Sequence, residues 1–230
     1  MRLPSEIGFV SLLQYSPRGM EDLAKRSRAI RDAIKRDSYI SIRRSTGPIE
    51  SMRAIQYYAT VMKAFVEHGH FPFLGQMFGT DVILVPVPGS APLVNKSALW
   101  SPMSICKALK AEGMCGEILP ILERTQAVQK SAFAAPGGRP GPEQHCESVA
   151  VTGSGDLPMF SSRRIVLVDD FVTRGSTFLG LYPHIEAAFP SWNIQCFAMV
   201  RTQSFGTLDA IWAPVEGKIT YRNGRPWRSP

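Results

Sequence analysis

The chain has 230 residues, of which 44% are hydrophobic and 20% charged, and its formal net charge at pH 7 is +7. Such a composition is typical of a globular protein with an ordinary core, and no stretch reaches the roughly 18 uninterrupted apolar residues of a membrane span. We therefore expect one sizeable α/β domain, in the cytoplasm and without a membrane partner. The positive charge indicates either a nucleic-acid partner or a substrate with several phosphates.

The cysteines and histidines are scattered, which argues against a metal site formed by them. The cysteines form no CxxC pair, so we expect neither a zinc ribbon nor a disulfide framework. They stand at Cys106, Cys115, Cys146 and Cys196. The histidines show no ligand spacing either, and no metal bound directly by protein side chains is predicted. They stand at His68, His70, His145 and His184.

Two amphipathic helices are predicted in the N-terminal third, over residues 20–36 and 48–68. In the first, Leu23, Ile30 and Ile34 share one face and basic residues occupy the rest. This basic face is either solvated or a secondary site for a phosphate-bearing partner. We predict that residues 1–75 form a helical segment that packs on, or forms a hood over, a core of residues 76–230.

Alternating strands and helices follow, as expected for a parallel sheet. Residues 81–87, apolar at every position after Asp81, predict a strand buried on both faces, and it ends in a loop rich in proline, glycine and serine. A helix over 102–112 and a strand over 117–122 are predicted next. From about residue 134 to 156 the composition lacks periodicity, which predicts a flexible loop within about 124–160.

The most informative segment is an apolar run that ends in two adjacent carboxylates. Residues 165–168 predict a central strand, so Asp169 and Asp170 fall at its carboxyl end, where ligands of open α/β sheets bind. The turn Thr173–Thr177 offers hydroxyls and backbone N–H groups ahead of a helix predicted over 176–189, which is suited to a phosphate. Carboxylates for ribose hydroxyls beside amides for a phosphate describe a ribose 5-phosphate site. The plain alternative is a βα connection with helix-capping residues.

The segment VLVDDFVTRGST resembles the PRPP-binding motif of type I phosphoribosyltransferases. The resemblance implies a doubly wound, mostly parallel sheet flanked by helices, with a small hood and a flexible lid loop. It assigns Asp169 and Asp170 to the ribose hydroxyls, as catalytic residues. It assigns the 5-phosphate to Thr173, Arg174, Gly175, Ser176 and Thr177. Two residues depart from the usual pattern: Phe171 replaces a smaller aliphatic, and Arg174 replaces a threonine.

Two further segments resemble the ComF-like and amidophosphoribosyltransferase-like branch of this family, without its N-terminal zinc module. The loop at Pro88, Gly89, Ser90 and Ala91 is similar to the pyrophosphate loop, to which Lys96 could add a cation. The polar stretch 124–131 is similar to a ComF-like segment. In such enzymes a lid follows, and Lys130 or Arg139 could close over the pyrophosphate; the alternative is a solvated loop.

The C-terminal part predicts a strand over 193–200, followed by Arg201 near the edge of the expected site, and a tail over about 208–230. In this tail Asn223-Gly224 predicts a hairpin or a tight turn. The aromatic residues Trp212, Tyr221 and Trp227 either form the floor of an acceptor pocket or only pack in a terminal element.

The resemblance therefore implies a Mg2+-dependent phosphoribosyltransferase. It would transfer the 5-phosphoribosyl group of PRPP to a nucleobase-like nitrogen acceptor and release pyrophosphate. The alternative is a non-catalytic module that senses PRPP or a nucleotide, or a ComF-like module that binds nucleic acid or a protein. A homodimer is possible, and nucleic acid is not the favoured partner. The acceptor stays open among adenine, guanine, orotate, ammonia and others.

Overall fold

The computed structural model describes residues 1–43, 48–93, 98–129, 140–153, 164–204 and 207–230. Its elements in chain order are β1 (Glu6–Tyr15), α1 (Asp22–Arg36), β2 (Tyr39–Arg43), β3 (Ile49–Arg53), α2 (Ala54–Glu67), α3 (Pro72–Met77), β4 (Gly79–Pro86), α4 (Ser101–Ala111), β5 (Cys115–Ile118), β6 (Leu122–Arg124), α5 (Pro142–Glu147), β7 (Val149–Val151), β8 (Arg164–Val172), α6 (Ser176–Ala188), β9 (Asn193–Thr202), β10 (Trp212–Arg222) and β11 (Arg225–Ser229).

A seven-stranded sheet in the order β11-β10-β1-β9-β8-β4-β5 forms the centre of the molecule. Five neighbouring strands, β1, β9, β8, β4 and β5, are parallel. In contrast, β10 pairs antiparallel with β1, and β11 pairs antiparallel with β10. The predicted α/β class with a mostly parallel sheet is thus confirmed. Two short antiparallel pairs, β2–β3 and β6–β7, lie outside this sheet.

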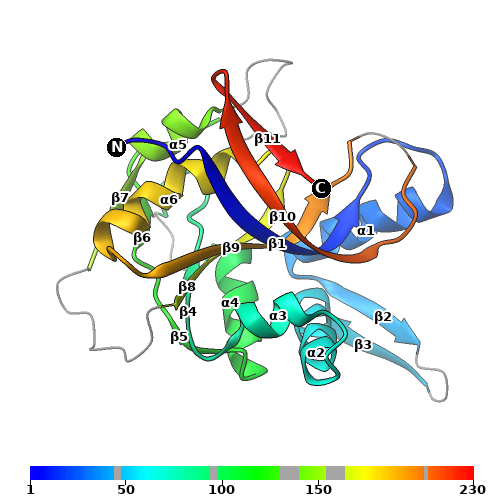
Figure 1. Cartoon of the computed structure of the whole chain (residues 1–230). Coiled ribbons are helices and arrows are strands. Elements are labelled where there is room, and N and C mark those ends of the chain that lie inside the picture. The colour runs from blue at the N-terminus through cyan, green and yellow to red at the C-terminus, as the bar shows by residue number, and fades with distance from the viewer. Residues whose placement is uncertain (44–47, 94–97, 130–139, 154–163, 205–206) are drawn as a thin grey trace.

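Helices cover both faces of the sheet, and this explains the continuous apolar run of β8. Ile165 and Leu167 point into a core with α6, whereas Val166 and Val168 point into a core with α1, α2, α3 and α4. Figure 1 shows α5 and α6 on one side of the sheet and α2, α3 and α4 on the other. A strand buried on both faces needs apolar residues at every position, not at every second one.

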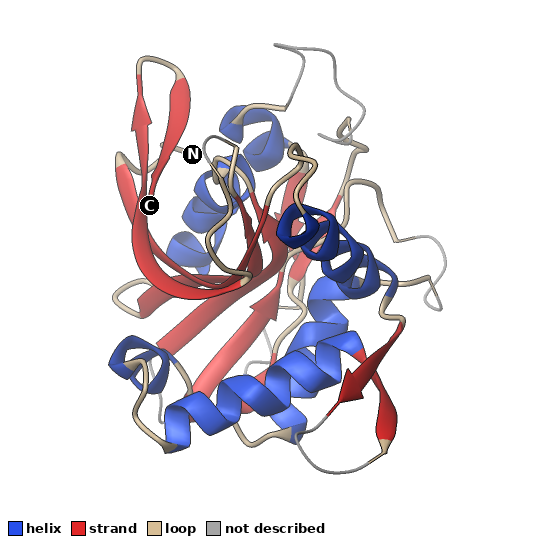
Figure 2. Ribbon diagram, turned by 90° about the vertical axis from the view of Figure 1, so that its right-hand side faces the viewer, coloured by secondary structure: helices blue, strands red, loops and turns tan. Residues whose placement is uncertain are grey.

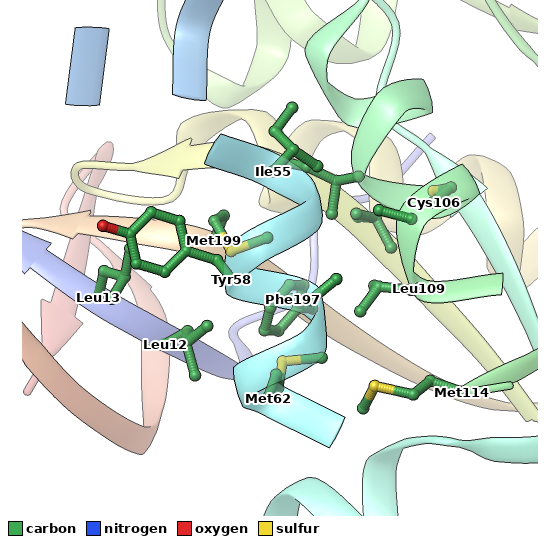
Figure 3. Packing of buried hydrophobic residues seen from close by; sticks show 14 of the residues in the cluster. Leu12, Leu13, Ile55, Tyr58, Met62, Cys106, Leu109, Met114, Phe197 and Met199 are labelled. Atoms are coloured by element: carbon green, nitrogen blue, oxygen red, sulfur yellow. The ribbon is translucent and has the colours of Figure 1, made fainter. Parts of the chain in front are cut away.

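The larger core lies on the α1–α4 face of the sheet. Figure 3 shows Ile55, Tyr58 and Met62 of α2 directed toward Phe197 and Met199 of β9. These five side chains are at most 2% exposed. Burial on this scale contributes roughly 1.5–3 kcal/mol for each large apolar side chain. This packing fixes α2 against the sheet.

The strand order reverses between β4 and β8, and this reversal creates the place where a ligand can bind. From β4 the chain passes through α4 to β5 on one side, and from β8 it passes through α6 to β9 on the other. The ends of β4 and β8 stay joined, because Pro86 lies opposite Val168 and the Val87 N–H donates to the Val168 carbonyl at 2.9 Å. Ligands of open α/β sheets bind in the crevice outside such a reversal.

The predicted elements of the core are found close to their expected bounds. The helices predicted over 20–36, 102–112 and 176–189 are α1, α4 and α6, and the strands predicted over 81–87 and 193–200 are β4 and β9. The predicted turn at Asn223-Gly224 is also confirmed: both residues have positive φ, 51° and 70°, and connect β10 to β11. The resulting strand pair extends from the sheet beside the C-terminus (Figure 2).

Two expectations for the N-terminal third are corrected, and one helix is added to it. The helix predicted from residue 48 begins only at Ala54, because residues 49–53 form β3 and pair with β2. The short helix α3 was not predicted. Residues 1–75, expected to be helical, also include β1, which lies between β10 and β9 in the main sheet. The division of the chain at residue 75 stays a prediction.

The region expected to form a lid contains regular structure in its described part. Residues 140–153 include α5 and β7, where an aperiodic loop was predicted. The strand predicted over 117–122 is divided between β5, in the main sheet, and β6, which pairs with β7. These elements have three to six residues, too few to show a period in the sequence.

In the described ranges, none of the helices has the length and apolar character needed to cross a membrane.

A close contact between α5 and α6 gives a test of this packing. A Cβ on Gly180 of α6 would come closer than van der Waals contact to the Pro142 carbonyl oxygen and the His145 Cβ. We expect Gly180→Ala to lower the free energy of unfolding by about 1–3 kcal/mol, because overpacking outweighs the better helix propensity of alanine. The control is Gly75→Ala in α3, whose Cβ would meet only Val66 at an ordinary 3.8 Å. Denaturant unfolding should show a loss for the first variant alone.

Candidate functional site

Asp169 and Asp170 lie near the end of β8, at the reversal of the strand order. Asp169 is 8% exposed and Asp170 is half-buried. Oδ1 of Asp169 accepts the Asp170 N–H at 2.8 Å. Burial raises the pKa of both carboxyls, and for Asp169 the neighbouring Asp170 carboxylate raises it further. Two carboxyls in such surroundings favour a ligand that supplies hydroxyl donors or positive charge.

One cation of the basic helix α1 is close to this pair. The positive charge of Lys35 opposes the rise in pKa of both aspartates. Its Nζ stands 5.1 Å from the ring centroid of Phe171, the next residue along β8. The Ser101 hydroxyl, at the beginning of α4, donates to the Lys35 carbonyl at 3.1 Å, which anchors this end of α1. One residue of the predicted basic face, Lys35, is therefore close to the carboxylates.

The turn after β8 has the backbone geometry of an anion-binding loop. Gly175 is left-handed, with φ of 88°, and immediately precedes α6. A Cβ at this position would also collide with Ile219 of β10, so the site requires glycine on two grounds. Ser176 and Thr177 form the first turn of α6 and are half-buried, and Arg174 is exposed. The free N–H groups of a helix beginning attract anions.

Arg228 of β11 supports this turn from behind. Its Nε donates to the Thr173 carbonyl at 2.9 Å and its second terminal nitrogen donates to the Thr202 carbonyl at 2.6 Å. The Thr173 and Thr202 hydroxyls lie 3.1 Å apart. Burial, and to a lesser extent the nearby Arg201, lower the pKa of Arg228 to about 10. Two cations with restricted access to water thus stand next to the turn.

The loop that follows β4 is held in place by three separate contacts. The Trp100 indole donates to the Val87 carbonyl at 2.7 Å, and the Val128 N–H donates to the Ser90 carbonyl at 2.7 Å. Arg124, only 5% exposed, donates through Nε to the Gly89 carbonyl at 3.0 Å. In this loop Pro88 is buried, Gly89 and Ala91 are exposed, and Ser90 is half-buried. Its backbone is therefore fixed while its tip stays accessible.

Arg124 carries a buried charge that pairs with no carboxylate within the described ranges. Besides Gly89, it donates to the Ser148 hydroxyl at 2.6 Å and to the His145 carbonyl at 3.3 Å. Burial lowers its pKa, and the negative charge of Asp169 opposes this. The neighbouring His145 has a pKa lowered to about 4 by burial and by Arg124. This arrangement places positive charge directly behind the loop after β4.

The structure brings together most of the residues predicted for the site. The carboxylates, the turn 173–177 and the loop 88–91 meet at the adjoining ends of β8 and β4. Lys96, Lys130 and Arg139 lie outside the described residues.

The aromatic residues proposed for an acceptor pocket belong to three different places. The Trp212 ring lies 5.0 Å from that of Tyr58 in the core, Tyr221 donates to the Glu143 carboxylate, and Trp227 is 62% exposed on β11. These contacts favour the packing alternative for Trp212, because its neighbours are the aromatic rings of α2.

Sequence reasoning missed Lys35 and Arg228 and gave Arg124 no role in the site. In the sequence, Lys35 is one of several basic residues on its helix, and no local pattern marks Arg228 within the tail. Arg124 stands two residues after Leu122, with Glu123 between them, and this position near the end of a strand was an available signal.

The two carboxylates are of the type that binds a divalent cation. No cluster of three or more His, Cys, Asp or Glu side chains suited to a metal occurs in the described ranges. Mg2+ is commonly held by one or two carboxylates together with substrate phosphates and water. Asp169 and Asp170 could supply such carboxylates, although the sequence predicted no direct ligand, and burial raises the pKa of both.

Comparison with protein-family models gives no match, and comparison with curated proteins gives none either.

The buried carboxylates make a prediction about stability. The pKa of the Asp169 carboxyl is raised in the folded state. The stability that this carboxyl contributes is therefore fully present below its ordinary pKa, and it is lost as the pH rises through the pKa of the folded state. We expect Asp169→Asn to raise the free energy of unfolding of the ligand-free protein at pH 7, on the order of 1–3 kcal/mol. The gain should vanish toward about pH 4.

Thermal unfolding over this pH range measures the effect. Asn retains the acceptor for the Asp170 N–H, so loss of that hydrogen bond does not confuse the result. Asp209→Asn, at an exposed position, is the control and should leave the pH dependence unchanged. If Asp169→Asn is less stable than wild type at pH 7, groups of the protein already compensate the charge of the Asp169 carboxylate, and the prediction is wrong.

Proposed function

We propose that the chain is a magnesium-dependent phosphoribosyltransferase that binds PRPP across the adjoining ends of β4 and β8. The observation that carries this proposal is the convergence of a carboxylate pair, a glycine turn at the beginning of a helix, and an anchored loop at one reversal of strand order. These groups match, in this order, the ribose hydroxyls, the 5-phosphate and the pyrophosphate of PRPP. The sequence resemblance supports the same ligand.

Each group has a physical role in the proposed reaction. Asp169 and Asp170 would accept hydrogen bonds from the ribose hydroxyls and stabilise the positive charge that develops at C1. The turn 173–177 would fix the 5-phosphate and thereby orient the ring. Backbone N–H groups of the loop 88–91 would bind the pyrophosphate, and Arg124 favours its negative charge from behind. Bound Mg2+ would supply charge neutralisation for the leaving pyrophosphate.

The proposed chemistry is a substitution at C1 of the ribose. A lone pair of the acceptor nitrogen forms the new bond to C1 as the C1–O bond to pyrophosphate breaks, and the bonding electrons leave with the pyrophosphate oxygen. An acceptor nitrogen that carries a proton releases it to solvent, whereas a pyridine-type nitrogen carries none and becomes positively charged. The protein contributes mainly position and electrostatics, because no described side chain needs to become covalently attached.

The first test is binding of PRPP in the presence of Mg2+, measured by calorimetry. We expect the double variant Asp169→Asn with Asp170→Asn to bind PRPP at least about 100-fold more weakly, because charge-assisted hydrogen bonds and cation contacts are both lost. The substitutions are nearly isosteric, so the variant should stay folded by circular dichroism. PRPP affinity equal to that of wild type would contradict the assignment of the two carboxylates.

Turnover separates the enzyme from a module that only senses PRPP. An enzyme releases pyrophosphate from PRPP when an acceptor is present, and this release is measured directly. Binding of PRPP without release across nitrogen acceptors would favour the sensing module.

The role of Arg124 gives a test of the pyrophosphate loop. We expect Arg124→Met to weaken PRPP binding by about 10-fold or more, because the Gly89 carbonyl loses its anchor and the buried positive charge is removed. Affinity for ribose 5-phosphate should change little, since this ligand lacks the pyrophosphate. Arg222→Met, at an exposed arginine of β10, is the control. Equal losses for both ligands would assign Arg124 a general structural role instead.

A further inference from the structure

The surroundings of Phe171 form a second surface beside the carboxylate pair. Phe171 packs against the α1–α4 core, edge to face with Tyr15 at the end of β1, with ring centroids 6.0 Å apart and planes at 88°. Arg31 of α1 stands over the Tyr15 ring, with Cζ 5.2 Å from its centroid, and Lys35 stands 5.1 Å from the Phe171 ring. Two aromatic rings and two cations, here called the α1 wall, are thus adjacent to Asp170.

The residues of the α1 wall are held by contacts within the fold, and part of the wall is accessible to solvent. Tyr15, Phe171 and Arg31 are half-buried, and Lys35 is exposed. Arg31 is held by Asp32, with 2.7 Å between its guanidinium nitrogen and the carboxylate. The described ranges contain no carboxylate in ion-pair contact with Lys35. A cation that is anchored through its backbone at Ser101 and has no salt-bridge partner can bind an anionic group of a ligand.

The position of the wall relative to the other groups defines its role. Along the edge of the sheet, the loop 88–91 follows β4, the carboxylates end β8, and Tyr15 ends β1, beyond β9. A direct substitution at C1 requires the entering nitrogen and the leaving pyrophosphate on opposite sides of the ribose. With pyrophosphate at the β4 side, the acceptor enters from the side of β9 and β1. The α1 wall faces this side.

We propose that the α1 wall is the acceptor subsite and that the acceptor is a planar nitrogen heterocycle bearing a carboxylate. This inference rests on the proposed function and specifies its second substrate. The rings of Phe171 and Tyr15 provide apolar contact for a flat ligand. Lys35 binds the carboxylate of the acceptor, while Arg31 adds positive charge. A neutral heterocycle would leave Lys35 beside the ring without a salt-bridge partner. The wall therefore selects a heterocycle with a carboxylate over the same ring without one.

Two matched pairs of probes test the selection, nicotinate with nicotinamide and orotate with uracil. Within each pair the ring is shared and the carboxylate is the main difference. Binding to the wild-type protein is measured by calorimetry in the presence of Mg2+ and ribose 5-phosphate, and pyrophosphate release is measured with PRPP. We expect at least one carboxylate probe to bind about 10-fold or more tightly than its neutral partner. Weaker or equal binding of both carboxylate probes overturns the inference.

The variant Lys35→Met removes the charge and keeps a flexible apolar side chain. We expect it to abolish the preference for the carboxylate probe and to weaken binding of that probe more than binding of PRPP, because Lys35 also lies near Asp169 and Asp170. Lys25→Met, on an exposed part of the same helix, is the matched control and should change neither quantity. If Lys35→Met weakens PRPP and leaves the preference intact, Lys35 serves the donor and the inference is wrong.

The proposed function can fail independently of this inference. Absence of PRPP binding by the wild-type protein rejects the phosphoribosyltransferase itself. PRPP binding together with a preference for neutral heterocycles rejects only the assignment of the α1 wall.

Discussion

The burial of two adjacent carboxyls at the end of β8 is the constraint on which the rest of the site depends. Asp169 is 8% exposed, and burial together with the neighbouring Asp170 carboxylate raises its pKa, so its ionisation there is unfavourable. A fold selected for stability alone would place apolar or amide groups at this position. The cost is consistent with a ligand that completes the site, because hydroxyl donors and a cation would remove it.

The positive groups near this point are distributed so that none neutralises the pair at salt-bridge distance. Arg124 approaches from the β6 side, Lys35 from α1, and Arg228 reaches only the turn that follows. The guanidinium groups of Arg124 and Arg228 are held by backbone or hydroxyl partners, whereas the ammonium of Lys35 lies over the Phe171 ring. Positive charge held as in the two arginines needs little reorganisation when an anionic ligand binds.

The antiparallel strands β10 and β11 contact the turn 173–177 and so contribute to the candidate site. Ile219 of β10 occupies the space where a side chain on Gly175 would stand, and Arg228 of β11 binds the Thr173 carbonyl. The C-terminal tail, expected as a terminal element, thus shapes the turn 173–177. In the same way α1, expected as a basic surface, contributes Lys35 to the site. Segments at both ends of the sequence converge on one short motif of β8.

The sequence by itself determined the elements whose signal is local. The apolar run 165–168 requires a strand buried on both faces, the two carboxylates must follow it, and Asn223-Gly224 favours a tight turn through its positive φ angles. The proposed class of ligand also follows from adjacent residues, because neighbouring groups would bind its ribose and its phosphate.

Only the tertiary structure decided which distant residues join this motif. Lys35, Arg124 and Arg228 are separated from Asp169 by 45 or more positions, and no periodicity relates them to it. Their placement depends on strand order, on the pairing of β1 between β10 and β9, and on the contacts that anchor each side chain. Such pairings are set by packing across the whole sheet, which no window of sequence contains. The motif of the proposed donor site was therefore visible in the sequence, and its charged surroundings were not.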